Sequence, residues 1–458
     1  MTPRALTGGV RTFILIWFGQ LISLIGSGLT SFALGVWVYR QTGSVTQFAL
    51  ISLFTLLPSI VLAPLTGALV DRLDRRQVLI FCDTLAGLST LVIALLFTTG
   101  ELAIWHIYLI VGIRSICDGF RWPALNASIA LLMPGEQLGR ANGMMQAARA
   151  AAQILPPVIA GVLILAIGLQ GVIVIDFTTF LVAITTLLIV PIPRPQGTEP
   201  VPMEQRSLLR EVAYGWRYIA TRPGLVGLLF VFAIVNFLLG IISVLVTPLV
   251  LATASTAALG TVLSIGGMGM LAGSVAMSIW GGPQRRMHGV FGFLFLDGIC
   301  IILAGLRPFV PLFAGAAFGF FFGLALLNGC FWTIWQSRVA PDVQGRVFAT
   351  IQMIATSSLP LGYLAAGPLA DYLFEPLLLA GRPLTDSIGR VIGVGPGRGI
   401  GLLFIVLGVL MILTTAVAYL NPRLRLLEDE LPQVPPGAGA QANSDAADRA
   451  AVPEYMQG

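Results

Sequence analysis

Three charged residues lie at helical spacing inside one apolar stretch of this sequence. Arg114, Asp118 and Arg121 stand at positions i, i+4 and i+7, which places them on one face of a helix. Arg149 lies near the middle of the next apolar stretch, and Asp297 near the middle of a later one. Charged groups among apolar residues are costly and usually face a cavity or a partner. The chemistry that this group could perform is the uptake and release of a proton.

Two interpretations of Asp118 remain open. In the first, Asp118 takes up and releases the proton, and Arg114 and Arg149 tune its affinity for it. In the second, Asp118 is a permanent counter-ion that makes the neighbouring arginines tolerable among apolar residues. An Asp118→Asn variant separates them, because only the first interpretation requires a titratable group.

The composition indicates that the folded chain is surrounded by a lipid bilayer. Of the 458 residues, 56% are hydrophobic and 10% are charged, and the mean hydropathy is +0.90. A soluble chain of this length needs more polar groups for its surface. The apolar runs are continuous, as in 50–70 and 401–418. Continuous runs favour spanning helices over the alternating strands of a membrane barrel.

Twelve apolar stretches are long enough to cross a bilayer as helices. The sequence therefore predicts an all-α membrane protein with 12 transmembrane helices. The spans are expected at 13–38, 46–70, 77–99, 103–126, 140–166, 171–191, 224–251, 257–280, 289–306, 309–335, 346–374 and 399–420.

The predicted spans divide the chain into four segments. Segments 1–191 and 224–426 each hold six spans, 192–223 is a polar linker, and 427–458 is a tail. Apolar residues recur at helical spacing between 208 and 219, which predicts an amphipathic helix on the cytosolic membrane surface or a solvated connector packed on loops. The tail is rich in Pro, Ala, Gly and acids and is expected to be disordered.

The distribution of arginine predicts the orientation. All 26 basic residues are arginines. Most of those in short loops fall on one side of the twelve spans, whereas Arg40, Arg307, Arg382, Arg390 and Arg398 fall on the other. Because basic loops stay in the cytosol, both termini are expected there, and the chain is expected to be a multi-pass protein of the cell (inner) membrane.

The loop after the second span carries a recognisable motif. It includes Gly67, Asp71, Arg72, Arg75 and Arg76 in the run GALVDRLDRR. This run closely resembles the cytosolic loop signature of the major facilitator superfamily. The glycine lets another helix approach, the aspartate can meet a helix N-terminus or an arginine, and the arginines hold the loop in the cytosol. The run departs from the family at position 74, where an acid replaces the usual glycine, and the matching loop at 281–286 lacks the acid.

Other segments resemble one branch of that superfamily, the macrolide-efflux-like drug:proton antiporters. They include Gly19 with Gln20 in the first span, and Gly345 with Arg346 at the start of the eleventh. Siderophore exporters share much of this pattern. The resemblance implies two six-helix bundles around a central cavity that opens alternately to each side, with export of an amphipathic small molecule, such as a macrolide-like drug, in exchange for protons.

Cargo contacts are expected where polar and aromatic side chains could line that cavity. Packing between helices would explain the same residues equally well. The candidates are Gln20, Trp37, Asn236, Phe237, Asn328, Trp332 and Gln336.

Several classes of function are excluded or disfavoured. A chain without lysine cannot supply the lysine of an ATP-binding phosphate loop. The two histidines and four cysteines are dispersed, so we expect no metal, no cofactor and no catalytic residue. The basic charge follows the loops, so no nucleic-acid partner is expected; the partners are a small-molecule substrate, protons and the bilayer, and the chain is expected to be a monomer. A siderophore or other metabolite exporter, an uncoupled facilitator, and a scaffold or receptor without transport remain alternatives.

Overall fold

The structure is a computed structural model that describes residues 3–70, 73–133, 138–190, 216–339, 344–378 and 388–430. These ranges are helical almost throughout, and no strand occurs in them. The predicted all-α class is confirmed. Most of the linker and all of the tail beyond residue 430 lie outside the described residues, so the predictions for these segments stay predictions.

The N-terminal half consists of five helical segments. The fifth bends at Gly168, whose φ of +67° interrupts the helix and divides it into two arms. The segments are α1 (Pro3–Thr42), α2 (Val45–Val70), α3 (Arg75–Thr98), α4 (Ile104–Leu132) and α5 (Leu138–Ile189).

The C-terminal half repeats this arrangement with six long helices and several short ones. The long helices are α7 (Pro223–Leu251), α8 (Thr256–Trp280), α9 (Arg286–Leu306), α10 (Val310–Arg338), α11 (Gln344–Pro368) and α14 (Arg398–Leu420). A π-helical segment (Leu369–Phe374) and the short helices α12 (Glu375–Leu377) and α13 (Ile388–Ile392) lie between α11 and α14, and α15 (Pro422–Arg425) and α16 (Leu427–Glu430) follow.

The long helices occupy the positions of the twelve predicted spans, with the two arms of α5 counted separately. Nine helices within the described ranges are by themselves long and apolar enough to cross a bilayer. Helix α4 is not among them, and it carries Arg114, Asp118 and Arg121 in its length. Arg114 and Arg121 have partners on neighbouring helices, as described below.

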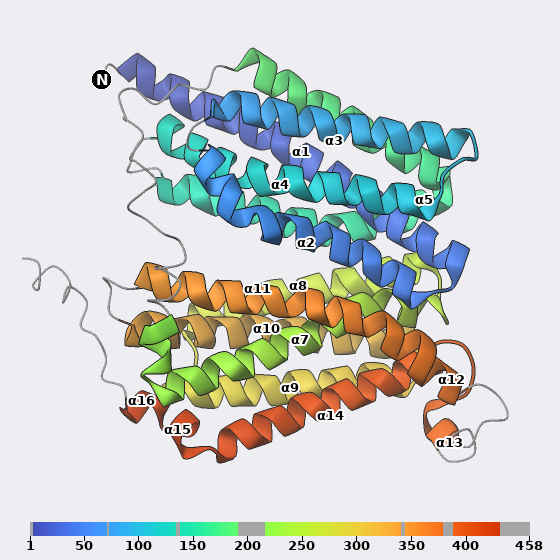
Figure 1. Cartoon of the computed structure of the whole chain (residues 1–458), viewed down its shortest axis with the longest axis vertical. Helices are drawn as coiled ribbons and strands as arrows, with labels where there is room; N and C mark the ends of the chain where they lie inside the picture. Colours follow the sequence, from blue (N-terminus) through green and yellow to red (C-terminus); the bar gives the residue numbers. More distant parts are fainter. Residues whose placement is uncertain are drawn as a thin grey trace, which may run out of the picture.

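The helices form two bundles that lie side by side (Figure 1). Helices α1 to α5 make one bundle and α7 to α14 the other. All of the long helices extend between the same two ends of the molecule. We call the end where α1 and α3 begin the Arg75 end; the N-terminus and α15 lie there. The opposite end, where α1 turns into α2 at Gly43, is the Gly43 end, and α12 and α13 lie there.

The two bundles meet through α5 with α8 and through α2 with α11. Gly161 and Gly260 allow the first pair to approach closely, since a Cβ at Gly260 would lie 2.8 Å from the carbonyl oxygen of Pro157. Near the Gly43 end, Val36 and Val45 of the first bundle belong to the same buried cluster as the core of the second. The bundles therefore share a hydrophobic core at that end.

Candidate functional site

A first buried charge network lies inside the N-terminal bundle. The amide nitrogen of Gln20 donates to Asp83 Oδ2 at 2.8 Å. The oxygen of the same amide accepts hydrogen bonds from Arg121 Nε at 2.9 Å and Nη2 at 2.6 Å. Arg121 Nε also lies 3.4 Å from Asp83 Oδ1. One neutral side chain thus joins a buried cation to a buried anion and satisfies both, which is the condition for tolerating charges in an apolar interior.

A second network lies further along the same bundle. Asp176 Oδ2 is 3.5 Å from Arg114 Nη1 and accepts a hydrogen bond from Thr90 Oγ1 at 3.1 Å. Asp176 Oδ1 accepts a hydrogen bond from Ser27 Oγ at 3.2 Å. Helices α1, α3, α4 and α5 therefore each contribute a polar group to it.

Glycines bring three of these helices, α1, α3 and α5, together. A Cβ at Gly19 or Gly26 of α1 would overlap Thr186 or Thr179 of α5. A Cβ at Gly87 of α3 would overlap the ring of Phe180 of α5. Small residues at helix contacts let the backbones approach closely, and here this approach places the side chains of both networks within hydrogen-bonding distance.

The group predicted around Asp118 is only partly assembled. Asp118 Oδ1 lies 3.7 Å from Arg121 Nη1, and the Asp118 side chain is 67% exposed. Arg114 pairs with Asp176 instead of acting on Asp118. The side chain of Arg149 lies outside the described part of the chain. Asp83 and Asp176 are the partners that the structure adds.

Asp297 is a second kind of buried carboxyl. It is 1% exposed, and its Oδ1 has no hydrogen-bond partner among the described residues. It lies in α9 against Gly323 of α10, where a Cβ would overlap Oδ1. An ionised carboxylate with an unsatisfied oxygen at this depth is costly. Asp297 lies near the middle of α9, as the sequence predicts.

The structure places the predicted cargo residues of the N-terminal half inside the bundle. Gln20 is buried in the first network, where its amide oxygen and its donated hydrogen bond are already engaged. Trp37 contacts Phe97 of α3 edge to face, with ring centroids 6.4 Å apart. Both residues make contacts inside the bundle, and their role as cargo contacts stays a prediction.

Four of the five cargo residues predicted in the C-terminal half are half-buried. Asn236 and Asn328 each donate an amide hydrogen to a carbonyl of their own helix. Trp332 lies edge to face with Phe348, and Phe237 is half-buried on α7. The side chain of Gln336 lies outside the described residues.

A cavity of about 370 Å³ lies between the helices of the C-terminal bundle. Residues of α7, α8, α9, α10, α11 and α14 line it, and most are apolar. Ser243, Thr247 and Tyr363 add hydroxyl groups to the wall. This cavity was not predicted, because residues from six helices form it and no segment of sequence marks it.

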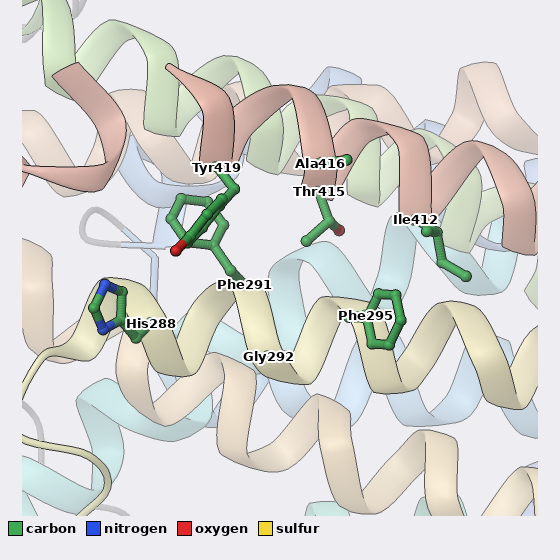
Figure 2. Close-up of a pocket in the computed structure, with 8 residues that line it drawn as sticks. All are labelled: His288, Phe291, Gly292, Phe295, Ile412, Thr415, Ala416 and Tyr419. Carbon is green, nitrogen blue, oxygen red and sulfur yellow. The ribbon is translucent and has the colours of Figure 1, made fainter. Parts of the chain in front are cut away.

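A second hollow lies between α9 and α14, on the side of the C-terminal bundle away from the N-terminal one (Figures 1 and 2). It measures about 400 Å³, and Gly292 leaves room for it between Phe291 and Phe295. His288 and Tyr419 lie at one end. It lies on the outer face, away from the contact between the bundles.

The loop motif is partly described. Gly67 lies in the last turns of α2, and Arg75 begins α3, while Asp71 and Arg72 lie outside the described residues. Arg76 donates from Nε and Nη2 to the carbonyls of Leu187 and Leu188, at 3.1 and 2.8 Å. It therefore caps the C-terminal end of α5, where a cation is favoured.

Position 74 has a local role. Asp74 is the N-cap of α3, and its carboxylate accepts a hydrogen bond from the backbone of Arg76 at 3.0 Å. This explains an acid where the motif usually has glycine. Gly345 and Arg346 lie in the first turn of α11, with the side chain of Arg346 outside the described residues.

Comparison with known proteins places these features in a family. The sequence profile described as Major Facilitator Superfamily matches residues 16–363. Macrolide efflux protein A of Streptococcus pyogenes is 30% identical over 375 residues, which cover 78% of this chain and 89% of that protein. Multidrug efflux pump Tap of Mycolicibacterium fortuitum is 24% identical and covers 91% of this chain and 97% of its own.

Solved structures share the fold. A bacterial homologue of the human lysosomal transporter Spinster, in an inward-facing and unoccupied conformation, aligns with a TM-score of 0.70 at 14% identity, over 93% of this chain and 98% of that one. The nucleoside transporter NupG aligns with a TM-score of 0.65 at 11% identity, over 90% and 99%.

Proposed function

The chain belongs to the major facilitator superfamily, and we propose that it is a secondary active exporter that moves amphipathic small molecules, such as macrolide-like drugs, out of the cell in exchange for protons. As a member of that family it is an integral membrane transporter of small molecules and not an enzyme. The observation that carries the proposal is the pair of buried charge networks inside an otherwise apolar bundle, next to a bundle with an apolar cavity.

The orientation that we propose has the Arg75 end in the cytosol of a cell-membrane protein, with both termini on that side. The loop arginines gather at this end. The bundles are joined by hydrogen bonds and a shared core at the Gly43 end. In this orientation the structure is the state closed toward the outside, from which cytosolic cargo would be taken up.

The cavity in the C-terminal bundle supports an amphipathic cargo. Its wall is apolar except for a few hydroxyl groups, which is the usual character of a small-molecule site. At about 370 Å³ it is near the lower limit of such sites, so it would hold the apolar part of a large drug. The remainder would lie between the bundles, within reach of Asn236, Phe237, Asn328 and Trp332.

For proton coupling we propose an exchange at Arg121. Asp118 is exposed and only loosely paired with Arg121, whereas Asp83 is buried and close to the same guanidinium. Protonation of Asp118 removes one of the two negative charges beside Arg121. The guanidinium then interacts with Gln20 and Asp83. Arg114 is held by Asp176 and would keep α4 in register, and a role of Arg149 in tuning Asp118 stays a prediction. Asp297 is a second proton site in this proposal, because an unsatisfied buried oxygen favours the neutral carboxyl.

The test is transport by inverted membrane vesicles with an imposed pH gradient. A macrolide should accumulate when the gradient is present and should stop accumulating when a protonophore is added. Gradient-independent movement down a concentration gradient would indicate an uncoupled facilitator. A siderophore as the only accumulated compound would replace the drug as cargo. No movement of any compound in a broad panel, from vesicles in which the chain is folded, would refute transport and favour a scaffold.

A further inference from the structure

The carboxylate of Asp371 lies at the boundary between the two bundles. It belongs to the π-helical segment that ends α11, yet its four hydrogen bonds all come from the N-terminal bundle. Oδ1 accepts from the backbone of Val45 at 3.0 Å, and Oδ2 accepts from the backbone of Thr46 at 2.8 Å. Oδ2 also accepts from the hydroxyls of Thr46, at 2.7 Å, and Ser44, at 2.8 Å.

These donors form the first turn of α2. The first N–H groups of a helix have no partner within the helix, and the helix dipole favours an anion beside them. The local N-cap residue Ser44 accepts from the backbone of Gln47 at 3.3 Å, as N-cap side chains normally do. The N–H groups of Val45 and Thr46 are instead bound by Asp371, more than 320 positions away. Asp371 is therefore a cap that one bundle provides for a helix of the other.

The backbones approach closely around this cap. A Cβ at Gly367 would overlap the backbone of Thr46. Gly43, with φ of +63°, makes the turn that presents the start of α2 to α11. A second hydrogen bond between the bundles lies at the same end, from Arg40 Nη2 to Thr256 Oγ1 at 2.5 Å. The cap is thus part of the closed contact at the Gly43 end.

Glu375, four residues later, caps a helix of its own bundle. Its carboxylate interacts with the backbone N–H groups of Gly397, Gly399 and Ile400, at the start of α14. Burial raises the pKa of Glu375, and these N–H groups with Arg398 partly oppose the rise. A single short segment therefore carries two acids that cap two helices, one in each bundle.

We propose that Asp371 is a positioning residue of the transport cycle that holds the Gly43 end closed. The inference rests on the alternating access proposed above. Separation of the bundles at this end must break the four hydrogen bonds of Asp371 and leave the first turn of α2 without its anion. The hydrogen bonds of Glu375 to the start of α14 lie within one bundle and persist through the same movement. Asp371 thus favours the closed state, and Glu375 stabilises both states equally.

The experiment measures the distance between the bundles at the Gly43 end. Spin labels are attached at Thr99→Cys and Phe309→Cys, which are exposed and lie at that end in different bundles. The four native cysteines are buried, so the labels go to the introduced sites. Pulsed electron paramagnetic resonance on the full chain in lipid, without cargo, then gives the populations of short and long distances.

In the wild type the short distance should dominate. Asp371→Asn should raise the ratio of long to short distances about ten- to a hundredfold, because hydrogen bonds to a charged acceptor are stronger than those to a neutral one. Glu375→Gln is the matched control and should leave the ratio unchanged. Thr46→Val removes one of the four donors and should shift the ratio by a few-fold, which keeps the test available if Asp371→Asn does not fold.

Two outcomes overturn the inference. One is an unchanged ratio in both Asp371→Asn and Thr46→Val, and the other is an equal shift in Glu375→Gln, which would indicate a general loosening of the segment. The distances are measured without cargo or a pH gradient. If the ratio shifts only in the Asp371 and Thr46 variants and the chain exports nothing, the role of Asp371 would be supported and the proposed exporter function refuted.

Discussion

The Gln20→Met substitution tests whether this buried amide belongs to the charge network or to the cargo cavity. Methionine has nearly the same length as glutamine and removes both hydrogen-bonding functions. The wild-type amide accepts two hydrogen bonds from Arg121 and donates one to Asp83. Each bond to a charged partner is worth about 1.5 to 3 kcal/mol.

The expected loss is smaller than the sum of these three contributions. Arg121 and Asp83 remain 3.4 Å apart in the structure, so they can close on one another and recover part of it. We expect a net loss of about 3 kcal/mol, which is the lower part of the range for disrupted buried ion pairs. For a unit the size of the N-terminal bundle, a loss of about 3 kcal/mol corresponds to a fall of roughly 6 to 12 °C in apparent melting temperature.

The assay is thermal unfolding of the purified chain in detergent, at a fixed heating rate because such unfolding is generally irreversible. Gln77→Met is the matched control, since Gln77 is exposed at the start of α3, and it should change the melting temperature little. A Gln20→Met variant that melts like the control but binds cargo more weakly would refute the network role and return Gln20 to the cargo site.

Three further predictions follow from the same geometry. Asp118→Asn should reduce protonophore-sensitive efflux at least tenfold with the melting temperature nearly unchanged, since its side chain is exposed; unaltered efflux would make Asp118 a counter-ion. Ala316→Phe should fill the cavity and raise the KM for bulky cargo several-fold, unlike Ala220→Phe at an exposed site, and equal KM values would remove the cavity from the pathway. The pKa of Glu375 is raised in the folded chain, so its protonated form stabilises the fold at low pH. This contribution to stability is lost as pH rises from the ordinary glutamate range through the raised pKa. The melting temperature of the wild type should therefore fall over this range, and that of Glu375→Gln should change less.

The helices were predictable because each span is encoded by its own residues. Lipid offers the backbone no hydrogen-bond partner, so a long apolar run must form a helix. Even α4, which carries charges, was predicted at 103–126 and is observed at Ile104–Leu132. The bend at Gly168 also fell between two predicted spans. These features depend on residues that are neighbours in sequence.

The partners of the charged residues were not predictable in the same way. Periodicity placed Arg114, Asp118 and Arg121 on one face, but it carries no information about α1, α3 and α5, which supply Gln20, Asp83 and Asp176. The contact of Gln20 with Arg121 could not be predicted, because the two residues lie 101 positions apart. The same holds for Asp371, whose partners start a helix at the other end of the chain.

The two bundles differ in how firmly their helices are fixed. In the N-terminal bundle, directional bonds from α1, α3, α4 and α5 converge on Asp176 and Gln20, so sliding or rotation of these four helices against one another would break bonds of the two networks. Around the C-terminal cavity the helices meet mainly through apolar side chains, which tolerate small sliding movements. In the proposed exporter, cargo of different shapes would therefore be accommodated by small adjustments of the C-terminal bundle against a stiffer N-terminal one.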